Sequence, residues 1–182
     1  MSFEKTLAEY NSVINSCREV FINKTKDYGT SWRAMRPRSL TDQMFIKAKR
    51  IRTIEESGSQ KIEDSIASEF MGLVNYGYMA LIQMKADSKL PIDLCIEETT
   101  NLYEAEVNEV RDLMAAKNSD YGEAWRDMRI SSFTDLILTK LHRIKQIEDN
   151  QGATIISEGA DGNYKDIINY SIFALIKIDE IK

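Results

Sequence analysis

The chain carries the same sequence segment twice, and this duplication limits what it can fold into. Residues 24–55 align without gaps with residues 117–148, at an offset of 93 positions, and 16 of the 32 aligned residues are identical. Both segments begin with the pattern Lys-x-x-Asp-Tyr-Gly-x-x-Trp-Arg. Farther along, one inserted residue shifts the offset to 94, where Asn75 aligns with Asn169. Because a repeat indicates one structural unit built twice, we expect two units of the same fold.

Each copy contains three stretches whose apolar residues recur at helical spacing, and no stretch alternates as a strand would. In the second stretch of the first copy these residues are Leu40, Met44, Ala48, Ile51 and Ile54. The sequence therefore predicts an all-α helical bundle made of two tandem pseudo-symmetric three-helix repeats, residues 1–86 and 87–182. Because each repeat is too small to bury a large core alone, we expect the two to pack as one globular unit.

Residues at the expected helix ends fit this division. Gly29 and Gly122 follow the first helix of each copy, where glycine tolerates the left-handed conformation. We expect each second helix to begin with a capping box, in which a hydroxyl caps the helix and a carboxylate lies three residues later. The predicted pairs are Ser39 with Asp42 and Ser132 with Asp135.

Composition and charge exclude several classes of protein. The chain has 24 Lys and Arg against 29 Asp and Glu, a net charge of −5, so we expect no direct nucleic-acid binding. No apolar run approaches the ~20 residues that a membrane helix needs, so no membrane partner is expected. The N-terminal residues lack a signal-peptide pattern. Two cysteines, Cys17 and Cys95, favour a reducing compartment, and we predict a cytoplasmic location.

The repeated signature is more polar than a turn requires. Cationic side chains bind phosphate and aromatic rings contact a base, so we predict a loop that binds a small-molecule nucleotide. The loop residues predicted to bind ligand are Lys24, Asp27, Tyr28, Trp32 and Arg33 in the first copy and Lys117, Asp120, Tyr121, Trp125 and Arg126 in the second. The alternative is that the tryptophan covers the end of the core while the aspartate and arginine pair across the loop.

Polar residues on the other two helices add to this prediction. Each second helix has a lysine and an arginine one turn apart at the margin of its apolar stripe, which suits either a phosphate site or a solvated face. These pairs are Lys47 with Arg50 and Lys140 with Arg143. Asn75 and Asn169 interrupt apolar helices, where a buried amide needs a hydrogen-bond partner on another helix or on a ligand.

The third helix of the second copy carries a candidate metal site. Glu158, Asp161 and Asp166 lie close together in the sequence. Mg²⁺ prefers such oxygen ligands, so we predict a magnesium site here. The alternative is a helix start followed by ordinary polar positions.

The D-Y-G and W-R signature, the K-x-x-R pair and the later D-x-x-N-Y segment resemble a bacterial and phage family called nucleotide modification associated domain 1. The resemblance covers both copies, and members carry the domain singly or in tandem. Through that family the chain is also distantly similar to all-α nucleoside triphosphate pyrophosphatases of the MazG type. This similarity implies a helical bundle that uses Mg²⁺, held by acidic residues, to cleave nucleotides between the α and β phosphates.

The chain departs from the pyrophosphatase pattern at two places. Where that pattern has E-x-x-E, this sequence has K-x-x-R, and where it has E-x-x-D, Asp166 is followed by Asn169. One hypothesis is a Mg²⁺-dependent nucleoside triphosphate pyrophosphohydrolase linked to nucleotide or DNA modification. The second is a non-catalytic nucleotide-binding or assembly module, and the third is a signature that serves packing alone. Duplication can replace a dimer or extend one, so a monomer and a homo-oligomer both stay open.

Overall fold

The computed structural model describes residues 3–58, 65–153 and 158–181, and the regular structure in these ranges is entirely helical. The first repeat contains α1 (Phe3–Tyr28), the short 3-10 helix η1 (Ser31–Ala34), α2 (Pro37–Ser57) and α3 (Ile66–Lys85). The second contains α4 (Ile96–Tyr121), η2 (Ala124–Asp127), α5 (Ile130–Asp149) and α6 (Ala160–Ile181). The predicted all-α bundle with three principal helices per copy is confirmed.

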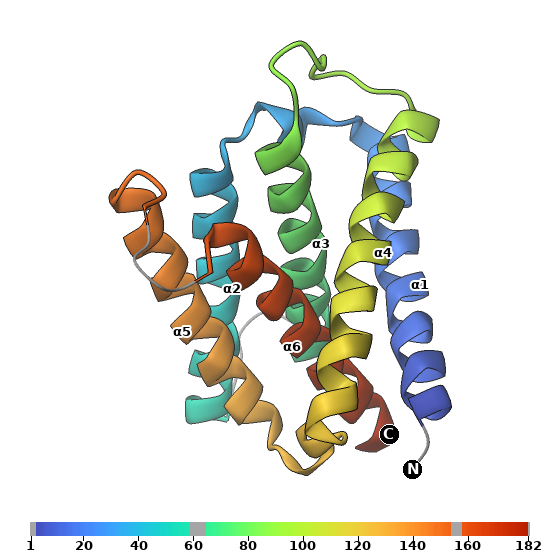
Figure 1. The fold of residues 1–182 in the computed structure, drawn as a ribbon, viewed down its shortest axis with the longest axis vertical. Coiled ribbons are helices and arrows are strands. Elements are labelled where there is room, and N and C mark those ends of the chain that lie inside the picture. Colours follow the sequence, from blue (N-terminus) through green and yellow to red (C-terminus); the bar gives the residue numbers. More distant parts are fainter. Residues whose placement is uncertain (1–2, 59–64, 154–157, 182) are drawn as a thin grey trace.

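The six long helices pack as three pairs, each made of equivalent helices from the two repeats (Figure 1). The pair α3 and α6 lies at the centre, with α1 and α4 on one side and α2 and α5 on the other. The two signature loops, which contain η1 and η2, lie at opposite ends of the bundle. None of the described helices combines the length and the apolar character needed to cross a membrane.

One hydrophobic core runs through both repeats. It takes in residues of all six long helices, and its largest fully buried side chains include four tyrosines: Tyr10, Tyr78, Tyr103 and Tyr164. Apolar burial drives such packing at roughly 25 cal/mol per Å², and neither repeat could bury these faces alone. The predicted helix stripe of α2 lies in this core at Leu40, Met44, Ala48 and Ile51.

Buried polar bonds cross between the repeats in matching positions. The Tyr10 hydroxyl on α1 donates to Asn169 Oδ1 on α6 at 2.6 Å. In the same way, the Tyr103 hydroxyl on α4 donates to Asn75 Oδ1 on α3 at 2.9 Å. Asn75 also donates to the backbone oxygen of Cys17 at 3.0 Å. Both asparagines therefore make contacts between helices, one of the two roles predicted for them.

A second reciprocal pair joins α2 to α5. Thr41 donates to Glu148 Oε1 at 2.8 Å, and Thr134 donates to Glu55 Oε1 at 2.8 Å. Burial raises the pKa of Glu55 above its ordinary value. Equivalent residues of α2 and α5 thus exchange partners, as expected for two repeats related by a pseudo-twofold axis.

The predicted capping boxes of α2 and α5 are wrong, because the cap of each helix lies three residues earlier. Arg36 and Arg129 hold the cap positions, and neither side chain caps its helix. The backbone N–H groups of Ser39 and Ser132 instead bond to the carbonyl oxygens of these arginines, each at 3.0 Å. Pro37 is the first residue of α2. Its fixed φ suits a helix, and its missing N–H costs nothing there because the first N–H groups of a helix have no partner within it.

The glycine positions were predicted correctly. Gly29 and Gly122 follow α1 and α4 with φ of 71° and 58°. A helix can end tightly in this left-handed conformation, which other residues adopt at a cost.

Candidate functional site

A cavity of about 590 Å³ opens beside the signature loop of the first repeat. Its walls come from α1, η1, α2 and α3, and five residues predicted to bind ligand line it: Lys24, Tyr28, Trp32, Lys47 and Asn75. Small-molecule sites commonly have volumes of about 300–1,000 Å³. The cavity therefore has the size of a ligand site and brings the polar signature of one repeat together.

Aromatic rings form part of the cavity wall. Trp32 is buried against Phe21, with 6.1 Å between ring centroids, whereas Tyr28 is mostly exposed at the rim. The indole N–H of Trp32 has no hydrogen-bond partner among the described residues. Tyr76 lines the wall formed by α3, and burial raises the pKa of its hydroxyl. The cavity thus offers aromatic surface together with one unsatisfied donor in its lining.

A buried carboxylate organises the cations from α2. Glu69 on α3 is 5% exposed and accepts from Lys47 Nζ at 3.3 Å and from an Arg50 guanidinium nitrogen at 2.5 Å. The Lys47 ammonium also lies 5.8 Å from the centroid of the Tyr76 ring. Lys24, on the other side of the cavity, forms no ion pair with any residue that the structure describes. Within the described ranges, no carboxylate therefore neutralises the charge of this lysine.

Gly72 leaves room for Lys47. A Cβ atom added at Gly72 would lie only 2.7 Å from Lys47 Cε, so the lysine side chain lies across the glycine. Any side chain at this position would force Lys47 to move. Gly72 thus shapes the cavity floor and lets Lys47 reach Glu69.

The second repeat arranges the same lysines differently. Asp166 on α6 accepts from Lys117 Nζ and from Lys140 Nζ, each at 2.8 Å and on separate carboxylate oxygens. Asp166 is 7% exposed. Burial lowers the pKa of Lys117, but the hydrogen bond and the charge of Asp166 outweigh it, so that this pKa lies above its ordinary value. Here a protein carboxylate joins the two predicted phosphate-binding lysines.

Trp125 is the counterpart of Trp32 and is equally buried, but it stacks face to face on another ring. Its ring stacks on Phe173 at 4.3 Å with an interplanar angle of 7°, and the Arg126 guanidinium lies 4.4 Å above it. Its indole N–H also has no hydrogen-bond partner in the described part of the chain. The packing alternative considered for the signature tryptophan thus describes Trp125 better than Trp32.

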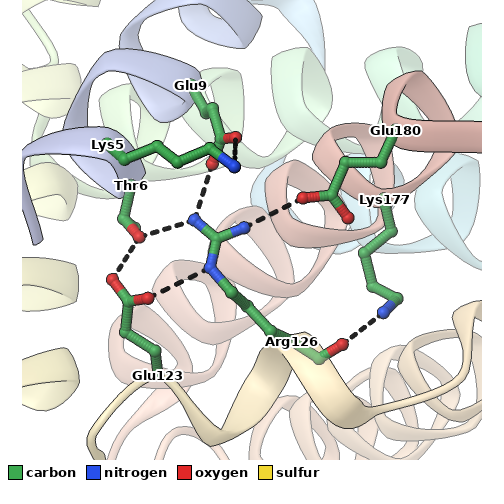
Figure 2. Close-up of polar contacts among 7 residues, drawn as sticks. All are labelled: Lys5, Thr6, Glu9, Glu123, Arg126, Lys177 and Glu180. Carbon is green, nitrogen blue, oxygen red and sulfur yellow. Dashed lines mark hydrogen bonds and ion pairs between the residues drawn. The ribbon is translucent and has the colours of Figure 1, made fainter. Parts of the chain in front are cut away.

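Arg126 connects η2 to helices of both repeats rather than lining the cavity (Figure 2). Its guanidinium donates to Glu9 at 2.6 Å, Thr6 at 2.7 Å, Glu180 at 3.0 Å and Glu123 at 3.1 Å. Burial lowers the pKa of Arg126, but these carboxylates outweigh it and raise the pKa overall. Each of the three guanidinium nitrogens donates to a residue of the protein itself, which argues against the predicted ligand role.

Arg33, the equivalent arginine of the first repeat, is also a structural residue. It is 9% exposed and donates to the side chain of Gln83 and to the backbone oxygens of Leu90 and Pro91, at 3.1 and 3.4 Å. These contacts hold the connection between α3 and α4 against η1. The prediction that this arginine binds ligand is therefore not supported by its position.

The remaining predicted ligand residues lie outside the cavity lining. Asp27, Asp120 and Tyr121 are exposed. Arg50 donates to Glu69 but does not itself line the cavity, and Arg143 donates to Gln146 at 3.5 Å.

The predicted metal ligands do not assemble into a site. Glu158 and Asp161 are exposed, whereas Asp166 is buried between two ammonium groups that a divalent cation would have to displace. The described residues contain no group of three or more His, Cys, Asp or Glu that could hold a metal ion. These residues do not fit a resident Mg²⁺, because the only buried carboxylate among them is already neutralised.

Three residues of the cavity wall, Glu69, Gly72 and Tyr76, were not among those predicted from the sequence to bind ligand. A signal for two of them was present in the repeat. At the offset of 94, Glu69 aligns with Asn163 and Gly72 aligns with Asp166. The acidic residue therefore lies one turn earlier in α3 than in α6.

Comparison with known proteins gives one match. A family model described as nucleotide modification associated domain 1 matches residues 24–84 and 117–178, once in each repeat and over more than half of the chain. No significant match was found among curated proteins or among solved structures. Each matched segment starts at the signature lysine and ends in the third helix of its repeat.

Proposed function

Because this chain belongs to the nucleotide modification associated domain 1 family, we propose that it binds a nucleotide in the cavity of the first repeat. The observation that carries this proposal is the position of Lys24. It lines the same cavity as Lys47, Trp32 and Tyr28, and it has no carboxylate partner among the described residues.

The cavity chemistry matches the two ends of a nucleotide. Ammonium groups form short charge-assisted hydrogen bonds with phosphate oxygens, so Lys24 and Lys47 would hold the phosphate. Aromatic faces attract the flat ring of a base, and Trp32, Tyr28 and Tyr76 supply such faces in the wall. An acceptor on the ligand would also satisfy the Trp32 indole N–H, whose burial without a partner costs free energy.

The donor set favours binding over metal-dependent hydrolysis. Among the residues that the structure describes, Glu69 is the only carboxylate that lines the cavity, and it is held by Lys47 and Arg50. A metal ligand needs a free anionic oxygen, and two adjacent cations oppose that role. The non-catalytic nucleotide-binding module is therefore our preferred function, and the Mg²⁺-dependent pyrophosphohydrolase stays the alternative.

Binding can be tested by calorimetry with common nucleoside and deoxynucleoside mono- and triphosphates, comparing Lys24→Ala with Lys26→Ala. Lys26 lies exposed on the same helix but does not line the cavity. We expect Lys24→Ala to weaken binding at least tenfold and Lys26→Ala to leave it within about twofold, since a distant surface charge contributes little. Equal affinities in the two variants would contradict the proposed site.

The same panel, incubated with Mg²⁺ or Mn²⁺, decides between the two functions. Release of pyrophosphate and monophosphate would establish the hydrolytic alternative, whereas binding without release would establish the module. A parallel measurement on Asp166→Ala addresses the metal prediction, because loss of turnover in that variant would restore the metal role of Asp166.

A further inference from the structure

We propose that each chain binds one ligand, in the first repeat alone, because Asp166 fills the anion position of the equivalent site in the second repeat. This inference rests on the proposed function and goes beyond it by assigning different roles to two copies of one sequence.

The lysines that would hold a phosphate are equivalent in the two repeats. Lys24 aligns with Lys117 and Lys47 aligns with Lys140, both at the offset of 93. Lys117 and Lys140 each lie 2.8 Å from one oxygen of Asp166. A carboxylate thus accepts from the two ammonium groups that a phosphate would otherwise join. A ligand would have to displace this buried carboxylate from both lysines to enter.

The first repeat lacks this carboxylate at the equivalent position. The counterpart of Asp166 is Gly72, which has no side chain. The acidic residue lies one turn earlier, at Glu69, where it accepts from Lys47 and Arg50 rather than from Lys24. No carboxylate in the described part of the chain bridges Lys24 and Lys47 as Asp166 bridges Lys117 and Lys140, and we place the anion of the ligand there.

The residue that packs beside the signature tryptophan also differs between the two repeats. Phe173 stacks flat on Trp125 in the second repeat, whereas its counterpart in the first repeat is Met79. Met79 lines the cavity beside Trp32. A methionine is flexible and adapts to a bound group, whereas two stacked rings already satisfy each other. The tryptophans of the two repeats thus have different neighbours, whereas the residue that closes the second site is Asp166.

Exchange of the two residues tests this inference. Titration with each of the four 2′-deoxynucleoside 5′-monophosphates should give one site per chain in the parent protein. Gly72→Asp should abolish that site, Asp166→Ala should give two sites, and the double variant should again give one. Gly72→Asn adds the volume of the aspartate without its charge. It should weaken binding, because it displaces Lys47, but it should keep one site. Loss of the site as complete as in Gly72→Asp would mean that volume rather than charge closes it. Asp161→Ala controls for loss of an exposed carboxylate on α6 and should also keep one site.

Two sites in the parent protein would overturn the inference. A single site in Asp166→Ala, in a variant whose circular dichroism and melting temperature show an intact fold, would overturn it as well.

A second measurement separates failure of this inference from failure of the proposed function. Brief acetylation with an amine reagent, followed by mass spectrometry, reports whether each lysine is held by a carboxylate. We expect Lys117 to react several-fold more slowly than Lys24 in the parent protein and at a similar rate in Asp166→Ala.

If no nucleotide binds but this reactivity pattern is found, the proposed function fails while the closed state of the second repeat stands. If Lys117 and Lys24 react equally in the parent protein, Asp166 does not close its site and the inference is wrong.

Discussion

Tyr10 and Asn169 lie 159 residues apart in the sequence, yet the tyrosine hydroxyl donates to the amide oxygen at 2.6 Å inside the core. Both residues are buried, and they belong to different repeats. The equivalent bond between Tyr103 and Asn75 shows that each repeat completes a polar contact of the other. The two copies therefore share their buried polar bonds as well as their apolar core.

We expect Tyr10→Phe to lower the free energy of unfolding by about 1–2 kcal/mol, because it leaves the Asn169 oxygen buried without a donor. Tyr103→Phe should cost a similar amount. Urea unfolding followed by circular dichroism measures both. Tyr28→Phe is the control, since Tyr28 is 61% exposed and surface changes usually stay within about 0.5 kcal/mol. Equal stability of all three variants would show that the bonds contribute nothing.

Much of the fold could be predicted from the sequence because the same helix pattern occurs independently in both repeats. The apolar stripe of α2 and the glycines after α1 and α4 recur at fixed offsets, and periodicity of this length is a strong helix signal. The predicted starts of α2 and α5 were wrong. A serine followed three residues later by an aspartate resembles a capping box, but the same spacing also fits inside the first turns of a helix. Element boundaries depend on such local competition, which spacing alone does not resolve.

The candidate site was harder to predict because contacts depend on which way a side chain points. Both signature arginines looked suited to phosphate, but Arg33 holds the connection between the repeats and Arg126 joins η2 to α1 and α6. Their partners, such as Glu9 and Leu90, are distant in the sequence. The alignment shows that the acidic residue lies at Glu69 in one repeat and one turn later, at Asp166, in the other. Which lysines each carboxylate contacts could be seen only in the structure.

Removal of the Arg126 side chain should destabilise the protein much more than removal of a surface arginine. We expect Arg126→Ala to cost about 2–4 kcal/mol, because the carboxylates around it stay partly buried without a counter-charge. Arg38→Ala is a matched control, since its ion pair with Asp149 has both side chains mostly exposed and such pairs contribute about 0–1 kcal/mol. Similar losses of melting temperature in the two variants would contradict the network.

Glu109 should make the stability of the bundle depend on acidic pH. The hydrogen bond from Lys165, and then that from Lys85, lowers the pKa of this carboxyl from 4.5 to about 2. A carboxyl with a depressed pKa stabilises the fold above its unfolded pKa, and this contribution is lost as the pH falls. We therefore expect Glu109→Gln to flatten the decline in melting temperature between pH 4.5 and about 2. Asp112→Asn, an exposed change on the same helix, should leave the decline unchanged, and an unaltered profile in Glu109→Gln would contradict the assignment.

Glu69 is the residue whose charge should set the affinity of the cavity for anions. It is buried beside Lys47 and Arg50 and offsets part of their charge. Glu69→Gln keeps the shape of the side chain and removes one negative charge. Charges about 4 Å apart interact by about 1–4 kcal/mol near a protein surface, so we expect deoxynucleoside monophosphates to bind about tenfold more tightly.

Calorimetry at low and at high salt measures this effect, because added salt screens it and should reduce the gain. Glu56→Gln, an exposed change near the end of α2, should leave the affinity unchanged. A lower affinity in Glu69→Gln would mean that the carboxylate itself contacts the ligand. It would then act as an acceptor for a base amino group, and the base rather than the phosphate would lie nearest to α3.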